Sequence, residues 1–152
     1  MRKLQISPGA LLVLRHHVES LYPEEACGGL LGLEDGPENL SVSEAAPHAN
    51  AQVPERQRRY LLVPEDVLRL ERRAEARGLQ VVGFYHSHPD AAARPSGFDL
   101  EHAWLWYIYL IVGVDEGKAG EISAWRLADD RRSFESLAIG SDGSLGPVGR
   151  AI

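Results

Sequence analysis

The stretch GFYHSHPDAAARPSGFDLEHAW, residues 83–104, decides how this chain is interpreted. It begins as an apolar strand, stops at a proline, crosses a loop of small residues and reopens as a helix at Ser96. Side chains two residues apart on a strand point to the same face, so His86 and His88 project side by side at the strand end. Ser96 and Asp99 are three apart and share the first helical turn. If the loop folds back over the strand end, Asp99 brings a carboxylate to the two imidazoles.

Two nitrogen ligands and one oxygen ligand suit Zn²⁺, and three protein ligands leave the fourth tetrahedral position for water, as catalytic zinc sites do. We therefore expect one zinc ion per chain on His86, His88 and Asp99. Other interpretations remain open for single residues. His102, one turn beyond Asp99, could be the third ligand instead, or a surface residue. The Ser96 and Asp99 spacing is also that of an ordinary helix N-cap.

The rest of the chain alternates strands and helices. Residues 64–78 form the clearest helix, with Pro64 first, acidic residues in the opening turn and Gly78 as terminator. The hydrophobic patterns predict the further helices 8–22 and 96–106 and the strands 3–7, 26–33, 39–46, 60–63, 79–88, 107–115, 121–128 and 133–139. We expect a mixed α/β fold of the α+β type, with a largely antiparallel sheet of about six strands flanked by helices. Residues 1–139 should form one domain, followed by a flexible tail at 140–152.

Composition excludes several classes of protein. A formal charge of −6 argues against a nucleic-acid partner. No run approaches the roughly 20 apolar residues of a membrane span, and the N-terminus does not match a signal peptide. Cys27 is the only cysteine, so no internal disulfide forms and a cytoplasmic location is expected. Cys27 lies in an apolar strand and is expected to be a buried packing residue. His48 and the pair at 16–17 have no partner at diagnostic spacing and are expected to be exposed.

The string H-S-H-P, six residues, then S-x-x-D resembles the signature of the JAMM/MPN family of zinc metalloproteases, and the similarity covers roughly residues 4–128. The family carries an upstream glutamate in an E-x-C-G context, which YPEEACGGLLG supplies as Glu25. The resemblance implies a cytidine-deaminase-like JAMM/MPN fold with zinc on His86, His88 and Asp99. It also implies that Glu25 is the general base and that Ser96 donates a hydrogen bond to the oxyanion. Glu24 is the neighbouring competitor for the base, but the E-x-C-G register favours Glu25.

The chain is similar to the short, stand-alone prokaryotic branch of this family, because the segment between His88 and Ser96 leaves no room for the insertions of deubiquitinating members. That resemblance implies a metallopeptidase for peptide or isopeptide bonds at the C-terminal tail of ubiquitin-like or sulphur-carrier (ThiS/MoaD-like) proteins. Two alternatives belong to other classes. One is a catalytically silent MPN scaffold that serves as a binding domain. The other is a DNA-associated protein of the RadC type, against which the acidic charge counts.

Overall fold

The computed structural model describes residues 3–36, 39–48 and 64–140, and its elements alternate along the chain as expected. In order they are β1 (Lys3–Ile6), α1 (Pro8–Leu21), β2 (Cys27–Glu34), β3 (Leu40–His48), α2 (Pro64–Ala76), β4 (Gln80–Pro89), α3 (Gly97–His102), β5 (Ile108–Asp115), β6 (Lys118–Leu127) and β7 (Phe134–Gly140). The predicted strand at 60–63 and residues 141–152 of the predicted tail lie outside the described residues, while Gly140, the first residue of that tail, ends β7. The single domain at 1–139 stays a prediction.

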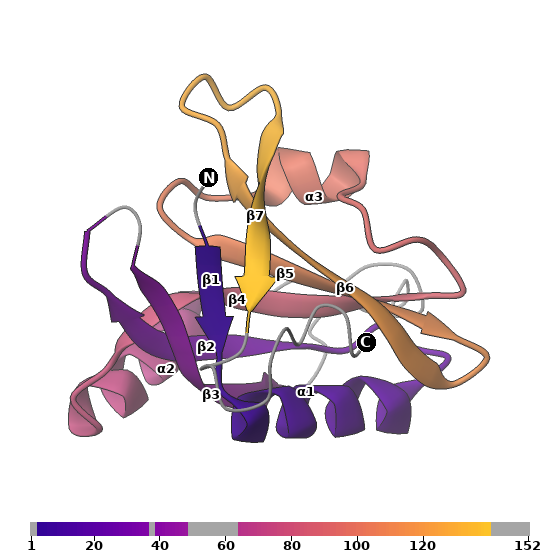
Figure 1. Ribbon diagram of the computed structural model, residues 1–152, viewed down its shortest axis with the longest axis horizontal. Coiled ribbons are helices and arrows are strands. Elements are labelled where there is room, and N and C mark those ends of the chain that lie inside the picture. Colours follow the sequence, from indigo (N-terminus) through magenta and orange to yellow (C-terminus); the bar gives the residue numbers. More distant parts are fainter. Residues whose placement is uncertain (1–2, 37–38, 49–63, 141–152) are drawn as a thin grey trace.

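The described strands close into a barrel in the order β1-β3-β2-β4-β5-β6-β7 (Figure 1). The short strand β1 closes it by pairing in parallel with β3 on one side and β7 on the other. The β4–β5 pair is also parallel, and the other four pairings are antiparallel. The mixed, helix-flanked sheet predicted from the sequence is confirmed. Its closure was not predicted, because Leu4 meets Leu40 and Ile139, which are far away along the chain.

Helices cover both sides of the sheet and divide the core into two clusters. On one side α1 packs Leu14 and Val18 against Tyr85 and the apolar residues of the neighbouring strands. Ser7 starts this helix, since its hydroxyl accepts the N–H of Ala10. On the other side α2 contributes Leu70 to a smaller cluster that also contains Cys27, Ala46, Phe84, Ala103, Tyr109 and Leu127. Alternate residues of β4 therefore serve opposite faces of the sheet.

Most boundaries differ from the prediction by one or two residues, as at the end of β3, and those of α3 and β6 differ by more. The helix expected over 96–106 ends at His102, because the backbone N–H of Trp104 donates to the Tyr109 hydroxyl at 2.7 Å instead of continuing the helical pattern. Strand β3 continues to His48, two residues beyond the predicted end at residue 46. Strand β6 begins at Lys118, three residues before the predicted start at 121. The β5–β6 turn takes only two residues, Glu116 and Gly117, both with positive φ as in a tight hairpin.

Within the described residues, no helix has both the length and the apolar character needed to cross a membrane.

Candidate metal centre

The β2–β4 pairing sets the positions of the two histidines and of Glu25. Cys27 lies directly opposite His86. One step further, the N–H of Ala26 donates to the Ser87 hydroxyl at 2.8 Å, and the Ser87 N–H donates to the Ala26 carbonyl at 3.0 Å. Glu25 precedes Ala26 and lies just outside β2, and its charge is among the causes that raise the pKa of His88, which places the two side chains near each other. Glu25 is buried although it carries a carboxylate.

Helix α3 brings Asp99 to the two histidines. Ser96 caps the helix with its hydroxyl, which accepts the N–H of Asp99 at 3.1 Å, while Asp99 Oδ2 accepts the N–H of Ser96 at 2.8 Å. This is the reciprocal capping box. The N-cap reading of the S-x-x-D spacing is therefore correct. It does not exclude a ligand role, since the same cap points the carboxylate of Asp99 at the histidines.

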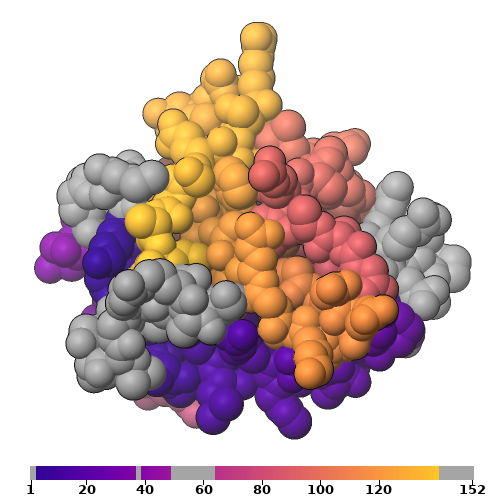
Figure 2. All heavy atoms as spheres, turned by 45° about the vertical axis from the view of Figure 1, so that its right-hand side comes forward, coloured from indigo at the N-terminus to yellow at the C-terminus, as the bar shows by residue number. Residues whose placement is uncertain are grey.

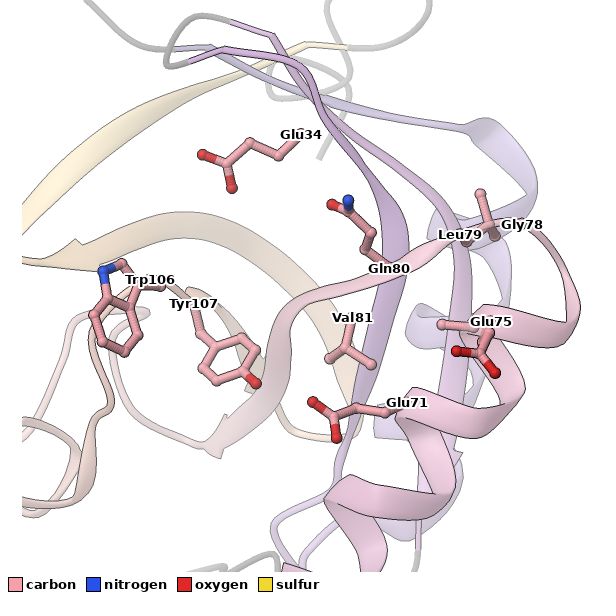
Figure 3. Close-up of a pocket in the computed structure, with 10 residues that line it drawn as sticks. Glu34, Glu71, Glu75, Gly78, Leu79, Gln80, Val81, Trp106 and Tyr107 are labelled. Atoms are coloured by element: carbon pink, nitrogen blue, oxygen red, sulfur yellow. The ribbon is translucent and has the colours of Figure 1, made fainter.

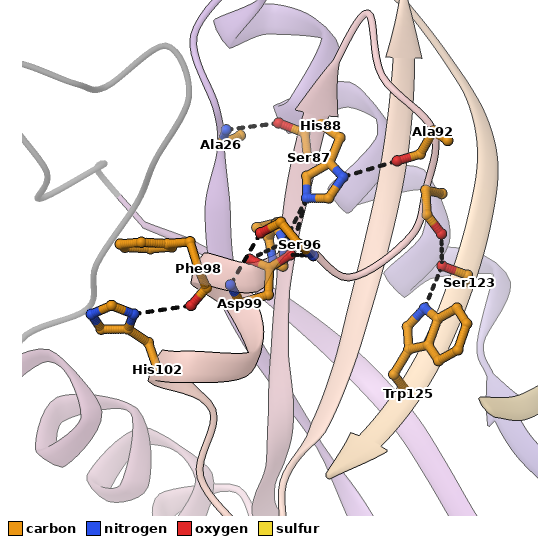
Figure 4. Close-up of polar contacts among 12 residues, drawn as sticks. Ala26, Ser87, His88, Ala92, Ser96, Phe98, Asp99, His102, Ser123 and Trp125 are labelled. Carbon is orange, nitrogen blue, oxygen red and sulfur yellow. Dashed lines mark hydrogen bonds and ion pairs between the residues drawn. The ribbon is translucent and has the colours of Figure 1, made fainter. Parts of the chain in front are cut away.

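The side chains of His86, His88 and Asp99 converge between β4 and α3 (Figure 4). His86 Nε2 lies 3.2 Å from His88 Nε2 and 3.2 Å from Asp99 Oδ1, and His88 Nε2 lies 3.2 Å from Asp99 Oδ2. Among the residues that the structure describes, this is the one group of three or more such side chains able to hold a metal ion. The side chain of His88 retains 11% of its exposure, so the group reaches the surface.

His102 does not belong to this group. Its Nδ1 donates to the Phe98 carbonyl at 2.9 Å, and its ring stacks on that of Phe98 with the centroids 4.1 Å apart. The side chain is exposed. Of the two readings that the sequence left open for His102, the surface residue is the one consistent with these contacts.

Burial and mutual contact perturb all three candidate ligands. Burial opposes ionisation of Asp99, but the hydrogen bonds to His86 and His88 outweigh it and hold the pKa of Asp99 far below its usual range. Burial dominates at His86 and lowers its pKa. Burial would also lower the pKa of His88, but Asp99, the Ala92 carbonyl and the charge of Glu25 together raise it. A metal ion would bind both imidazoles in their neutral form and Asp99 as a carboxylate.

The imidazole of His88 is oriented from behind by the backbone. Its Nδ1 lies 2.9 Å from the carbonyl oxygen of Ala92. A carbonyl oxygen only accepts, so Nδ1 carries a proton, and Nε2, which lies 3.2 Å from Asp99 Oδ2, is the nitrogen available to a metal ion. Metal-binding histidines commonly have such a partner on the second ring nitrogen. The sequence contained no signal for it, because a backbone carbonyl is the same at every residue.

The expectation for Cys27 is confirmed, whereas those for two histidines are wrong. Cys27 is fully buried, as expected, and burial raises the pKa of its thiol to about 12, which excludes a nucleophilic role. The expectation of exposure is wrong for two histidines. Nδ1 of His17 lies 2.7 Å from the Tyr85 hydroxyl, and Nε2 of His48 lies 3.0 Å from Asp66. Both side chains are half-buried.

A cleft of about 700 Å³ lies elsewhere on the molecule (Figure 3). Its lining includes Glu71 and Glu75 of α2, the start of β4 at Gln80, and Trp106. His86 lies six positions after Gln80 on the same strand, which corresponds to a distance of about 20 Å. This cleft is thus remote from the candidate metal centre and is not part of it.

Comparison with known proteins identifies relatives of the chain. Residues 7–128 match the family described as prokaryotic homologs of the JAB domain, Prok-JAB. A desampylase of Haloferax volcanii is 39% identical over 77% of this chain and 79% of its own length. A desampylase of Pyrococcus furiosus is 31% identical over 88% of this chain and 92% of its own length. A probable TtuB-protein conjugate cleaving protease of Thermus thermophilus is 30% identical over 76% of this chain and 74% of its own length.

Solved structures share the fold. A protein from Desulfitobacterium hafniense superposes with a TM-score of 0.80 at 23% identity, covering 91% of this chain and 92% of that one. A JAB1/MPN domain protein from Archaeoglobus fulgidus gives 0.54 at 20% identity, covering 90% and 95%. The predicted family resemblance and fold class are confirmed. The curated relatives are hydrolases by name, so the prediction that this chain is a hydrolase of the JAB type is confirmed as well.

Proposed function

Because this chain belongs to the Prok-JAB family, we propose that it is a zinc-dependent peptidase that cleaves peptide or isopeptide bonds at the tail of a ubiquitin-like or sulphur-carrier protein. The observation that carries the proposal is the convergence of His86, His88 and Asp99 in one group, with the charge of Glu25 acting on His88. The names of the relatives, two desampylases and a protease for TtuB-protein conjugates, support a protein conjugate as substrate. Residues 1–139 would be its catalytic domain, acting in the cytoplasm.

The spacing of the donor atoms supports zinc as the metal. Bonds of 2.0–2.1 Å at tetrahedral angles put neighbouring ligand atoms about 3.3 Å apart. The two imidazole nitrogens lie 3.2 Å apart, and each lies 3.2 Å from a different oxygen of the Asp99 carboxylate. Two imidazoles and one carboxylate are also a donor set that suits this ion and leaves one position free. The residues present therefore fit one zinc ion per chain.

When bound, the ion would supply Lewis acidity, which lowers the pKa of water towards 7 and polarises the scissile carbonyl. Glu25 would act as general base and acid. Its buried carboxylate, whose charge acts on His88, would take a proton from the attacking water and deliver it to the leaving amine.

Ser96 would stabilise the developing oxyanion. Its hydroxyl oxygen already accepts the N–H of Asp99, so its own proton is available to a substrate oxygen. The residue is exposed beside the candidate ligand Asp99. Loss of one oxyanion donor typically lowers kcat by about 10² to 10³. We expect a loss of this order for Ser96→Ala, which keeps the Asp99 side chain.

The test combines metal content with cleavage. The purified protein, loaded with zinc, is incubated with conjugates and C-terminally extended forms of ubiquitin-like and sulphur-carrier proteins, and products are identified by intact mass. Glu25→Gln should keep stoichiometric zinc and lose turnover by about 10² to 10⁴, the usual contribution of a general base. His86→Ala and Asp99→Ala should lose both zinc and turnover.

Glu24→Gln is the matched control, because it removes the neighbouring carboxylate without touching the proposed base. It should retain both zinc and activity. Equal losses in Glu24→Gln and Glu25→Gln would contradict the assignment of the base. A wild-type protein that purifies without zinc, and does not acquire it on titration, would instead favour the silent scaffold.

A further inference from the structure

The loop that carries the chain from β4 to α3 is tied to strand β6 by side chains that have no part in the mechanism above. Figure 2 shows this segment, in pink, against the orange atoms of β6. The Ser123 hydroxyl donates a short hydrogen bond to the carbonyl of Ala93. The indole N–H of Trp125 in turn donates to the Ser123 oxygen at 2.7 Å (Figure 4).

These contacts act on the peptide group that orients His88. The carbonyl of Ala92, which accepts the His88 Nδ1 proton, belongs to the same planar peptide unit as the N–H of Ala93. That N–H points to the Glu121 carboxylate at 3.4 Å, and the next carbonyl, of Ala93, is held by Ser123. The Ala93 side chain is buried. Strand β6 thus restrains the chain on both sides of Ala93.

The indole decides which way the Ser123 hydroxyl points. A hydroxyl has one proton to give and can accept at its lone pairs. Because Trp125 donates to the oxygen, the hydroxyl proton is left to the Ala93 carbonyl, and the two bonds strengthen each other. The direction of donation therefore runs from Trp125 through Ser123 to the loop.

We propose that Ser123 and Trp125 are positioning residues for the metal centre, which hold the loop so that the Ala92 carbonyl keeps His88 with Nδ1 protonated and Nε2 facing the ion. This inference rests on the proposed function, since it takes the metal to lie between His86, His88 and Asp99. Other contacts anchor the start of the loop, where the Asp90 carboxylate accepts from Tyr22 and from the N–H of Glu116. The Ser123 contact lies next to the Ala92 carbonyl itself.

Four variants separate positioning from general stability. Ser123→Ala deletes the hydroxyl, Ser123→Thr keeps it, and Trp125→Phe keeps an aromatic ring without the N–H. Ser41→Ala is the matched control, because Ser41 is a strand serine whose hydroxyl also donates to a backbone carbonyl, that of Leu33, in a different part of the barrel. Thermal unfolding of each variant verifies that it is folded.

The first measurement is zinc affinity in competition with a chelator. Changes in the groups behind metal ligands typically weaken binding by about 10- to 100-fold, and we expect Ser123→Ala at the lower end, about tenfold. Trp125→Phe should weaken binding less, while Ser123→Thr and Ser41→Ala should stay close to wild type. The second measurement is the tautomer of the neutral His88 imidazole in the zinc-free protein, from long-range ¹H–¹⁵N NMR. Wild type should show Nδ1–H, and Ser123→Ala a mixture.

Wild-type affinity and an unchanged tautomer in Ser123→Ala would overturn the inference. So would a loss that threonine fails to restore, or an equal loss in Ser41→Ala, since either would indicate a general packing effect. A wild-type protein that binds no zinc would overturn the proposed function instead. The NMR comparison needs no metal, so it would still decide whether β6 controls the His88 ring.

Discussion

Replacement of Gly83 by alanine tests whether close backbone packing between β4 and β5 supports the candidate metal centre. A Cβ added at Gly83 would lie 2.0 Å from the Ile108 carbonyl oxygen and 2.7 Å from its carbon, whereas ordinary contact begins at 3.4 Å. The obstacle is backbone, so no side-chain rotation relieves it. The strands would have to separate by about 1.4 Å at the first pair of their register.

That displacement implies a large loss of stability. Overpacking in a well-packed core commonly costs about 1–3 kcal/mol, and a clash between two backbones should reach at least about 3 kcal/mol. For a chain of this size each kcal/mol lowers Tm by about 2–4 °C, so Gly83→Ala should melt about 6–12 °C below wild type. Because His86 and His88 lie on the same strand, zinc affinity should fall with it.

Thermal unfolding followed by circular dichroism measures the effect, and Gly9→Ala provides the matched control. A Cβ at Gly9 meets nothing within 4 Å, and the residue lies in the first turn of α1. The same chemical change there should leave stability unchanged or raise it by up to about 1 kcal/mol. A Gly83→Ala protein that melts within about 2 °C of wild type would refute the argument from backbone contact.

Three further results are expected. Leu110→Ala, at a fully buried position, should lower the free energy of unfolding in urea by about 2–5 kcal/mol. Leu12 on α1 is 71% exposed, so Leu12→Ala should change the same quantity by less than about 0.5 kcal/mol. Similar costs for the two variants would contradict the assignment of the core. Burial, and then the charges of His16 and His48, lower the pKa of His17. The unfolded chain therefore binds protons more readily, and stability falls as the pH drops below about 6.5. The variant His17→Asn should make the fall of Tm shallower between about pH 7 and pH 5, and an unchanged slope would exclude this cause. A chelator should abolish hydrolysis but leave a cooperative melt a few degrees lower, because the barrel has its own apolar core; loss of the melt would indicate a structural ion.

The candidate site was predictable from the sequence where its geometry is local. The spacing of His86 and His88 on a strand, and of Ser96 and Asp99 in one helical turn, follows from the two backbone periods. The loop between them is short, so bringing the two pairs together needs no long-range information. The family resemblance then led to the prediction of Glu25, which lies some sixty residues earlier in the chain.

What only the tertiary structure decided depends on partners distant in sequence or on backbone atoms. Barrel closure by β1 and the Ser87 contact with Ala26 arise from strand pairing, which leaves no periodic trace in either strand alone. The end of α3 depends on the Tyr109 hydroxyl. The support behind His88 runs through carbonyl groups, which every residue carries, to a serine and a tryptophan on β6 whose type and spacing are common in strands. Local patterns specify elements and ligand types, while the supports that orient them depend on contacts made when the chain folds.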